Sequence, residues 1–80
     1  MNMEIEQVKE TIINFICEEL SIEEDDLETD MNLGAYGLGS VAGATLTGIL
    51  EDTYNLKLSP LLVFDYPTID ELSSAIKELV

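Results

Sequence analysis

Ser40 is the residue of this sequence whose surroundings are best suited to chemistry. It stands between glycines in the uncharged stretch YGLGSVAGATL, residues 36–46, of a chain that is otherwise strongly acidic. A serine hydroxyl becomes a nucleophile when a neighbouring base removes its proton, and histidine is the usual base. The sequence has no histidine and no lysine near Ser40. Ser40 is therefore expected either to receive a group from another protein or merely to cap a helix.

The composition excludes most classes of enzyme. A domain of 80 residues buries only roughly 60% of its unfolded surface, which leaves little room for an enclosed active site. The lack of histidine and the single cysteine, Cys17, rule out a catalytic triad, a closed zinc site and an internal disulfide. The acidic residues 23–30 match a calcium-binding loop only as far as Met31, where that loop needs glycine. We expect one non-catalytic domain over residues 1–80, without a metal.

The charge of the chain predicts its partners and its compartment. A net charge of -14 is repelled by anionic lipid and by nucleic-acid phosphate, so the expected partners are proteins with basic surfaces. No apolar segment approaches the roughly 20 residues that span a membrane. The beginning of the chain, MNMEIEQVKE, lacks the apolar run of a signal peptide. Together with the free Cys17, these features predict a cytoplasmic protein that binds neither membrane nor nucleic acid.

The elements that position Ser40 are predicted from apolar periodicity. Residues 3–20 have the pattern of an amphipathic helix, and Cys17 beside its apolar stripe is expected to be a half-buried structural residue. Residues 21–37 have weak periodicity and clustered acids, which indicates a long loop. The apolar positions of the first helix are Ile5, Val8, Ile12, Phe15, Ile16 and Leu20, and those of the loop are Ile22, Leu27 and Leu33.

Three more helices are predicted after this loop. One begins at or beside Ser40 and runs to Tyr54, and a short one follows the Ser59-Pro60 start signal. The last begins at Thr68, whose Thr-x-x-Glu pattern is a capping box. The second helix is predicted from Val41, Ala44, Leu46, Ile49, Leu50 and Thr53, the short one from Leu61, Leu62, Val63 and Phe64, and the last from Ile69, Leu72, Ile76 and Leu79. The fold class is therefore all-α, a small bundle of three longer helices and one short one.

The chain resembles the acyl carrier proteins over nearly its whole length. GLGSVAGATL is similar to the Gly-Leu-Asp-Ser-Leu signature of that family, and NLKLSPLLVFDYPTIDELSSAI is similar to the segment that follows it. The LVFDYPT segment is most similar to carrier domains of modular polyketide synthases, less similar to fatty-acid carriers and least similar to peptidyl carriers. The resemblance implies a non-catalytic carrier in which Ser40 holds 4'-phosphopantetheine, derived from coenzyme A, and the arm carries acyl groups as thioesters.

The resemblance also implies partners and a docking surface. The partners would be a phosphopantetheinyl transferase and synthase enzymes such as an acyltransferase or a ketosynthase, acting on a monomeric carrier. The implied docking residues are Leu38, Gly39, Val41, Ala42 and Thr45. This sequence departs from the family at three of them: Gly39 and Thr45 replace usual acids, and Val41 replaces a usual leucine.

Two interpretations of the chain remain open at this point. In the first, it is a working carrier, and transfer of phosphopantetheine from coenzyme A to the chain would demonstrate this. In the second, it is a degenerate carrier fold that serves only for docking, with Ser40 as a helix cap. Ser40 and the glycines around it favour the first interpretation.

Overall fold

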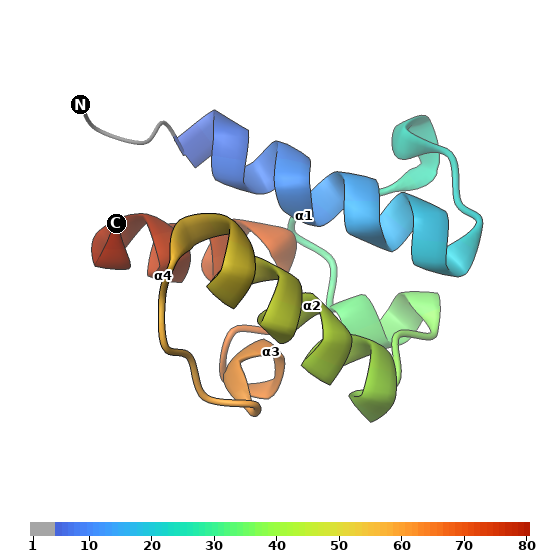
Figure 1. Cartoon of the computed structure of the whole chain (residues 1–80). Coiled ribbons are helices and arrows are strands. Elements are labelled where there is room, and N and C mark those ends of the chain that lie inside the picture. The colour runs from blue at the N-terminus through green and yellow to red at the C-terminus, as the bar shows by residue number, and fades with distance from the viewer. Residues whose placement is uncertain (1–4) are drawn as a thin grey trace.

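The predicted set of helices is present in a computed structural model, which describes residues 5–80 (Figure 1). The α-helices are α1 (Ile5–Leu20), α2 (Ser40–Tyr54), α3 (Leu62–Asp65) and α4 (Ile69–Leu79), and two 3-10 helices are η1 (Glu24–Asp26) and η2 (Leu33–Tyr36). The described residues contain no strand. Residues 3 and 4 of the first predicted helix lie outside the described residues. None of the helices over 5–80 has the length and apolar character needed to cross a lipid bilayer.

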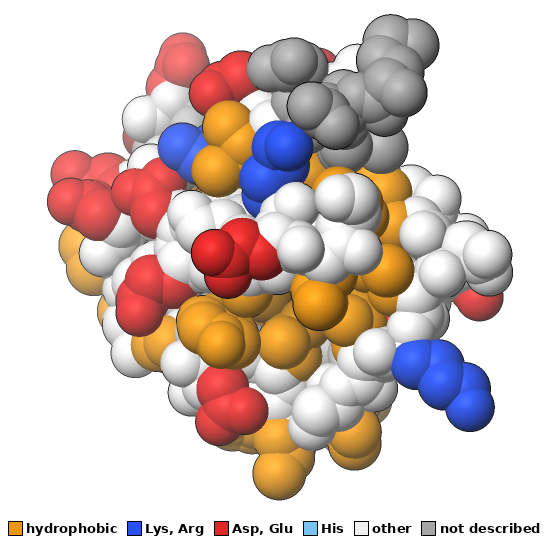
Figure 2. Space-filling view, turned by 90° about the vertical axis from the view of Figure 1, so that its left-hand side faces the viewer, with side chains coloured by type: hydrophobic (Ala, Val, Ile, Leu, Met, Phe, Trp, Pro, Cys, Tyr) orange, Lys and Arg blue, Asp and Glu red, His pale blue; other side chains and the backbone are white. Residues whose placement is uncertain are grey.

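The core forms where one side of each α-helix meets the others. α1 packs most extensively on α4 and also contacts α2, while α3 packs against α2 (Figure 1). The end of α4 reaches the face shown in Figure 2, where hydrophobic side chains are visible at the surface among acidic ones. The buried hydrophobic side chains are Val8, Ile12, Ile16, Leu27, Leu33, Leu46, Leu50, Leu62, Val63, Ile69, Leu72 and Ile76.

The buried side of α2 differs from the pattern that predicted this helix. Leu46 and Leu50 are buried, but Gly43 and Thr47 complete the buried side. The hydroxyl of Thr47 donates to the carbonyl of Gly43 at 3.0 Å, so this polar group is satisfied inside the fold. Glycine and threonine do not count as apolar in a periodicity argument, and the stripe that contains them was therefore missed. The exposed members of the predicted set are Val41, Ala44, Ile49 and Thr53.

The segment predicted as a long loop contains η1 and η2 and is fastened to the start of α4. The backbone N–H of Leu33 donates to the carbonyl of Pro67 at 2.8 Å, and that of Asp70 donates to the carbonyl of Thr29 at 2.9 Å. The predicted apolar anchors of the segment are buried or half-buried: Ile22, Leu27 and Leu33. The backbone that leads to α2 is therefore held in place by contacts with a distant part of the chain.

The two C-terminal helices begin close to their predicted start signals. The hydroxyl of Thr68 accepts the backbone N–H of Glu71 at 3.0 Å and donates to the Glu71 carboxylate at 3.0 Å. Ser59 Oγ accepts the N–H of Leu61 at 3.1 Å, but α3 itself starts only at Leu62, one residue later than predicted. The predicted stripes also contain apolar residues that prove to be exposed at the ends of these helices: Leu61, Phe64 and Leu79.

Candidate functional site

Ser40 is the first residue of α2 and is exposed. The N-cap position before it belongs to Gly39, and no side chain caps the start of this helix. The first hydrogen bond of α2 runs from the N–H of Gly43 to the carbonyl of Gly39, at 2.9 Å. Ser40 is thus one residue inside the helix. A role as N-cap, the alternative considered from the sequence, does not account for this serine.

Two glycines keep the approach to Ser40 open. A Cβ added to Gly37 or to Gly39 would meet no other atom within 4 Å. Gly37 has φ of 93°, a left-handed conformation that ends η2 and favours glycine. Gly39 has φ of -88° and ψ of 178°, an extended conformation that any residue can adopt. The turn therefore requires only the first glycine, and the second is free to vary without backbone strain.

The electrostatic surroundings of Ser40 favour an attached phosphate. The N–H groups of Ser40, Val41 and Ala42 precede the first hydrogen bond of α2 and have no acceptor within the helix. The positive end of the helix dipole lies at the same place. Residues 31–50 contain no charged side chain, so no carboxylate of that stretch opposes a phosphate there. The site fits a phosphate ester on the serine oxygen.

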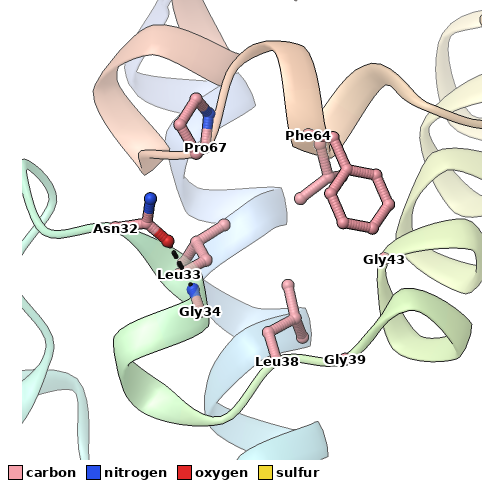
Figure 3. Close-up of a pocket in the computed structure, with 9 residues that line it drawn as sticks. Asn32, Leu33, Gly34, Leu38, Gly39, Gly43, Phe64 and Pro67 are labelled. Carbon is pink, nitrogen blue, oxygen red and sulfur yellow. Dashed lines mark hydrogen bonds between the residues drawn. The ribbon is translucent and has the colours of Figure 1, made fainter.

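A cavity of about 190 Å³ opens beside this start of α2 (Figure 3). Leu38 and Phe64 approach it from two different segments, and Gly43 of α2 lies at its wall (Figure 3). At its other side, Asn32 Oδ1 accepts the N–H of Gly34 at 2.8 Å, which fixes the turn there. The cavity thus joins the loop before α2 to the α3 region. Leu38 and Gly39 of its lining were implied as docking residues from the sequence, whereas Leu33, Val63 and Phe64 were predicted only as apolar positions of the fold.

The residues implied as docking positions lie together at the beginning of α2. The side chain of Val41 is 80% exposed. The hydroxyl of Thr45 donates to the Val41 carbonyl at 3.0 Å, so it is partly occupied by its own helix. Two further exposed hydrophobic residues belong to the neighbouring α3 region and were missed as surface residues, because their helical spacing predicted burial. They are Leu61 and Phe64, with 58% and 60% of their surface exposed.

Cys17 lies apart from this site and has the properties of a structural residue. It is half-buried and packs against the core. Burial raises the pKa of the Cys17 thiol above its ordinary value, and the negative charges of Glu24 and Glu23 raise it further. A thiol with a raised pKa is a poor nucleophile at neutral pH. Within residues 5–80, no group of histidine, cysteine, aspartate or glutamate side chains is arranged to hold a metal ion.

Comparison with known proteins agrees with this fold and site. The family model described as "Phosphopantetheine attachment site" matches residues 10–76. The chain therefore belongs to the family of phosphopantetheine-binding carrier domains, whose prosthetic group is covalently bound 4'-phosphopantetheine.

Similar sequences occur within polyketide synthases. The chain is 34% identical over 65 residues, 80% of its length, to the non-reducing polyketide synthase terA of Aspergillus terreus. It is 31% identical over 62 residues, 78% of its length, to the polyketide synthase PksL of Bacillus subtilis. These matches span only 3% and 1% of the two synthases. The similarity therefore concerns one carrier domain of each synthase.

Solved carrier structures have the same fold. A free-standing peptidyl carrier protein from Acinetobacter baumannii superposes with a TM-score of 0.86 at 31% identity, covering 96% of this chain and 98% of that one. The HMG-ACPI domain of the CurA module from Lyngbya majuscula also gives a TM-score of 0.86 at 31% identity, covering 98% of this chain and 79% of that one. Both structural neighbours are carrier proteins.

Proposed function

We propose that this chain is an acyl carrier that holds 4'-phosphopantetheine on Ser40 and carries acyl intermediates of polyketide biosynthesis as thioesters. The observation that supports Ser40 most directly is its position: an exposed hydroxyl that does not cap its helix, at the positive end of α2. The membership of the carrier family supports the choice of prosthetic group. The polyketide context is supported by the synthases in which similar domains occur.

The residues of this chain would serve as substrate and handle, and not as catalysts. In the loading reaction the Ser40 oxygen would form a bond to the pantetheine-linked phosphorus of coenzyme A, and adenosine 3',5'-bisphosphate would leave. The proton of Ser40 must pass to a base of the transferase, since this sequence has no histidine. Once bound, the arm supplies a terminal thiol that holds acyl groups as thioesters. The free N–H groups at the start of α2 would then face the phosphate oxygens.

Partner proteins would recognise the surface around Ser40 mainly through its small and apolar groups. The proposed docking residues are Leu38, Gly39, Val41, Ala42 and Thr45, none of which is charged. The first acid along α2 is Glu51, whereas acids are dense in residues 23–30. A phosphopantetheinyl transferase or a synthase enzyme that binds this end of the monomer would therefore place apolar side chains on α2. Its basic residues would face the acidic loop.

Intact-mass measurement tests the assignment of Ser40. We expect the mass to increase by one phosphopantetheinyl group when the chain is incubated with coenzyme A, Mg²⁺ and a promiscuous phosphopantetheinyl transferase. Ser40→Ala should abolish the increase, while Ser74→Ala, which changes an exposed serine of α4, should leave it intact. Because Ser40 does not cap α2, the variant should keep its stability within about 0.5 kcal/mol.

Two other outcomes would redirect the proposal. Modification of Ser40→Ala would place the arm on another hydroxyl. A folded wild-type chain that several transferases fail to modify would favour the degenerate docking module. The class of acyl group can be tested once the chain carries phosphopantetheine. Enzymes that deliver malonyl, fatty acyl or aminoacyl groups are each offered to this chain, and the rates of transfer to its thiol are compared. The preferred group separates a polyketide carrier from a fatty-acid carrier and a peptidyl carrier.

A further inference from the structure

The C-terminal end of α1 carries two acids that this helix disfavours. Glu18 and Glu19 are exposed in the last turn of α1, where the helix dipole is negative, and that turn has no basic residue. Among residues 5–80 the ion pair formed is that of Lys9 with Asp70, near the other end of α1. The described chain thus supplies no cation to these two carboxylates. Acidic residues at the negative end of a helix, without a neighbouring cation, are typical of functional surfaces.

The same two acids border an open groove between α1 and α2. The groove has a volume of about 320 Å³ and is lined by Phe15, Glu18, Glu19 and Ile49. Ile49 is 37% exposed, and Phe15 is half-buried where it packs against the core. The groove therefore combines two apolar side chains with two unpaired carboxylates, which suits an apolar anchor that has a cation beside it.

Ile49 also connects this groove with the exposed beginning of α2. Val41, Thr45 and Ile49 are spaced by four residues and so lie along one side of the helix. The distance from Ser40 to Ile49 along α2 is about 13.5 Å, at 1.5 Å per residue. A partner seated in the groove can thus contact the surface near Ser40 as well.

We propose that the groove formed by Phe15, Glu18, Glu19 and Ile49 is a second docking site, for a basic segment of a partner protein. The segment inserts one aliphatic side chain between Phe15 and Ile49 and places a lysine or arginine beside each glutamate. Acidic segments are excluded by the two carboxylates and by the net charge of -14. This docking site does not depend on whether Ser40 is modified.

A peptide pair tests the chemistry of the site directly. The probe is an alanine-based helix with one central leucine flanked by arginines four residues before it and three residues after it. The first control peptide replaces both arginines with glutamate, and the second replaces the leucine with alanine. In an NMR titration of the isotope-labelled chain, the probe should cause the largest signal shifts at Phe15, Glu18, Glu19 and Ile49. Both control peptides should bind at least threefold more weakly.

Matched variants then separate the groove from the general negative charge of the chain. Glu18→Gln with Glu19→Gln should weaken probe binding about fivefold, as expected for two exposed ion pairs. The control pair Glu23→Gln with Glu24→Gln removes the same charge from neighbouring exposed positions outside the groove and should weaken it less than twofold. Ile49→Ser should weaken binding by a similar factor to the groove pair. Circular dichroism confirms that each variant is folded.

The result that overturns the proposal is specific. Equal binding of the arginine and glutamate peptides, equal weakening by the two glutamine pairs, or shifts centred on Val41 and Phe64 would each remove the groove as a docking site. Mass measurement of loading at Ser40 is made on the same samples. The proposed function therefore stands or falls separately from this inference.

Discussion

Gly43 of α2 faces Val63 of α3 so closely that a Cβ on Gly43 would lie 3.7 Å from the Cβ of Val63. That distance is an ordinary van der Waals contact, so the position has room for a methyl group and for little more. Gly43 is buried and also lies at the wall of the cavity beside Ser40. Gly43 therefore lies both in the contact between α2 and α3 and at the edge of the cavity.

Gly43→Ala is expected to stabilise the protein. Alanine in a helix interior is favoured over glycine by about 1 kcal/mol, which corresponds to a rise in melting temperature of roughly 4–8 °C for a domain of this size. Gly48→Ala is the matched control, because a Cβ on Gly48 meets no atom within 4 Å. Thermal unfolding of both variants tests the prediction. A stabilised Gly48→Ala beside a destabilised Gly43→Ala would show that α3 needs all the space that glycine leaves.

Gly39→Asp should improve the cap of α2 and alter recognition. Gly39 occupies the N-cap with an extended backbone and open space around it, so aspartate fits and should add a few tenths of a kcal/mol. A transferase that expects an acid before the serine should load this variant faster, while a cognate synthase enzyme should turn it over at an unchanged or lower rate. Initial loading rates and partner turnover are the measurements. Strong acceleration of the cognate partner would contradict the uncharged docking surface proposed here.

Salt should raise the melting temperature. The chain has seventeen acids against three basic residues, and one ion pair, between Lys9 and Asp70, is present among the described residues. Self-repulsion of the exposed acids is screened over about 8–10 Å at physiological ionic strength. Melting curves in sodium chloride, with an uncharged osmolyte of matched osmolality as control, check this. A melting temperature independent of ionic strength would mean that repulsion among the acids contributes little.

The Lys9–Asp70 pair should give a pH-dependent contribution to stability. Lys9 Nζ lies 3.0 Å from Asp70 Oδ1 and so connects α1 to α4. The hydrogen bond to Asp70 raises the pKa of Lys9 above its ordinary value of 10.5. The stabilisation is therefore fully present below pH 10.5 and is lost as the pH rises through the higher pKa of the folded state.

Lys9→Met should accordingly reduce the free energy of unfolding at pH 7 by less than about 1 kcal/mol, the usual range for a pair exposed to solvent. The difference from wild type should shrink as the pH is raised above 10.5. Lys57→Met, which removes the same charge from an exposed loop position, controls for net charge. Chemical denaturation at several pH values provides the measurement. A loss of stability that is equal for both variants would assign the effect to net charge alone.

Local sequence signals determined the helices and the position of Ser40. The capping pattern of Thr68 and Glu71 forms the hydrogen bonds that it predicts, because both partners lie within one turn of the chain. The predicted beginning of α2 at or beside Ser40 is confirmed for the same reason, since glycines and a change in periodicity mark it locally. The family resemblance rests on these local segments too.

Only the tertiary structure decided which side of each helix is buried and what surrounds the serine. Val41 and Ile49 fit a helical stripe as well as Leu46 does, and it is the packing of α3 on Gly43 that turns another side of α2 inward. The cavity beside Ser40 and the groove at Phe15 and Ile49 each join residues far apart in the sequence. Periodicity describes one helix at a time, whereas burial depends on which neighbour covers it, and that is settled when the helices pack together.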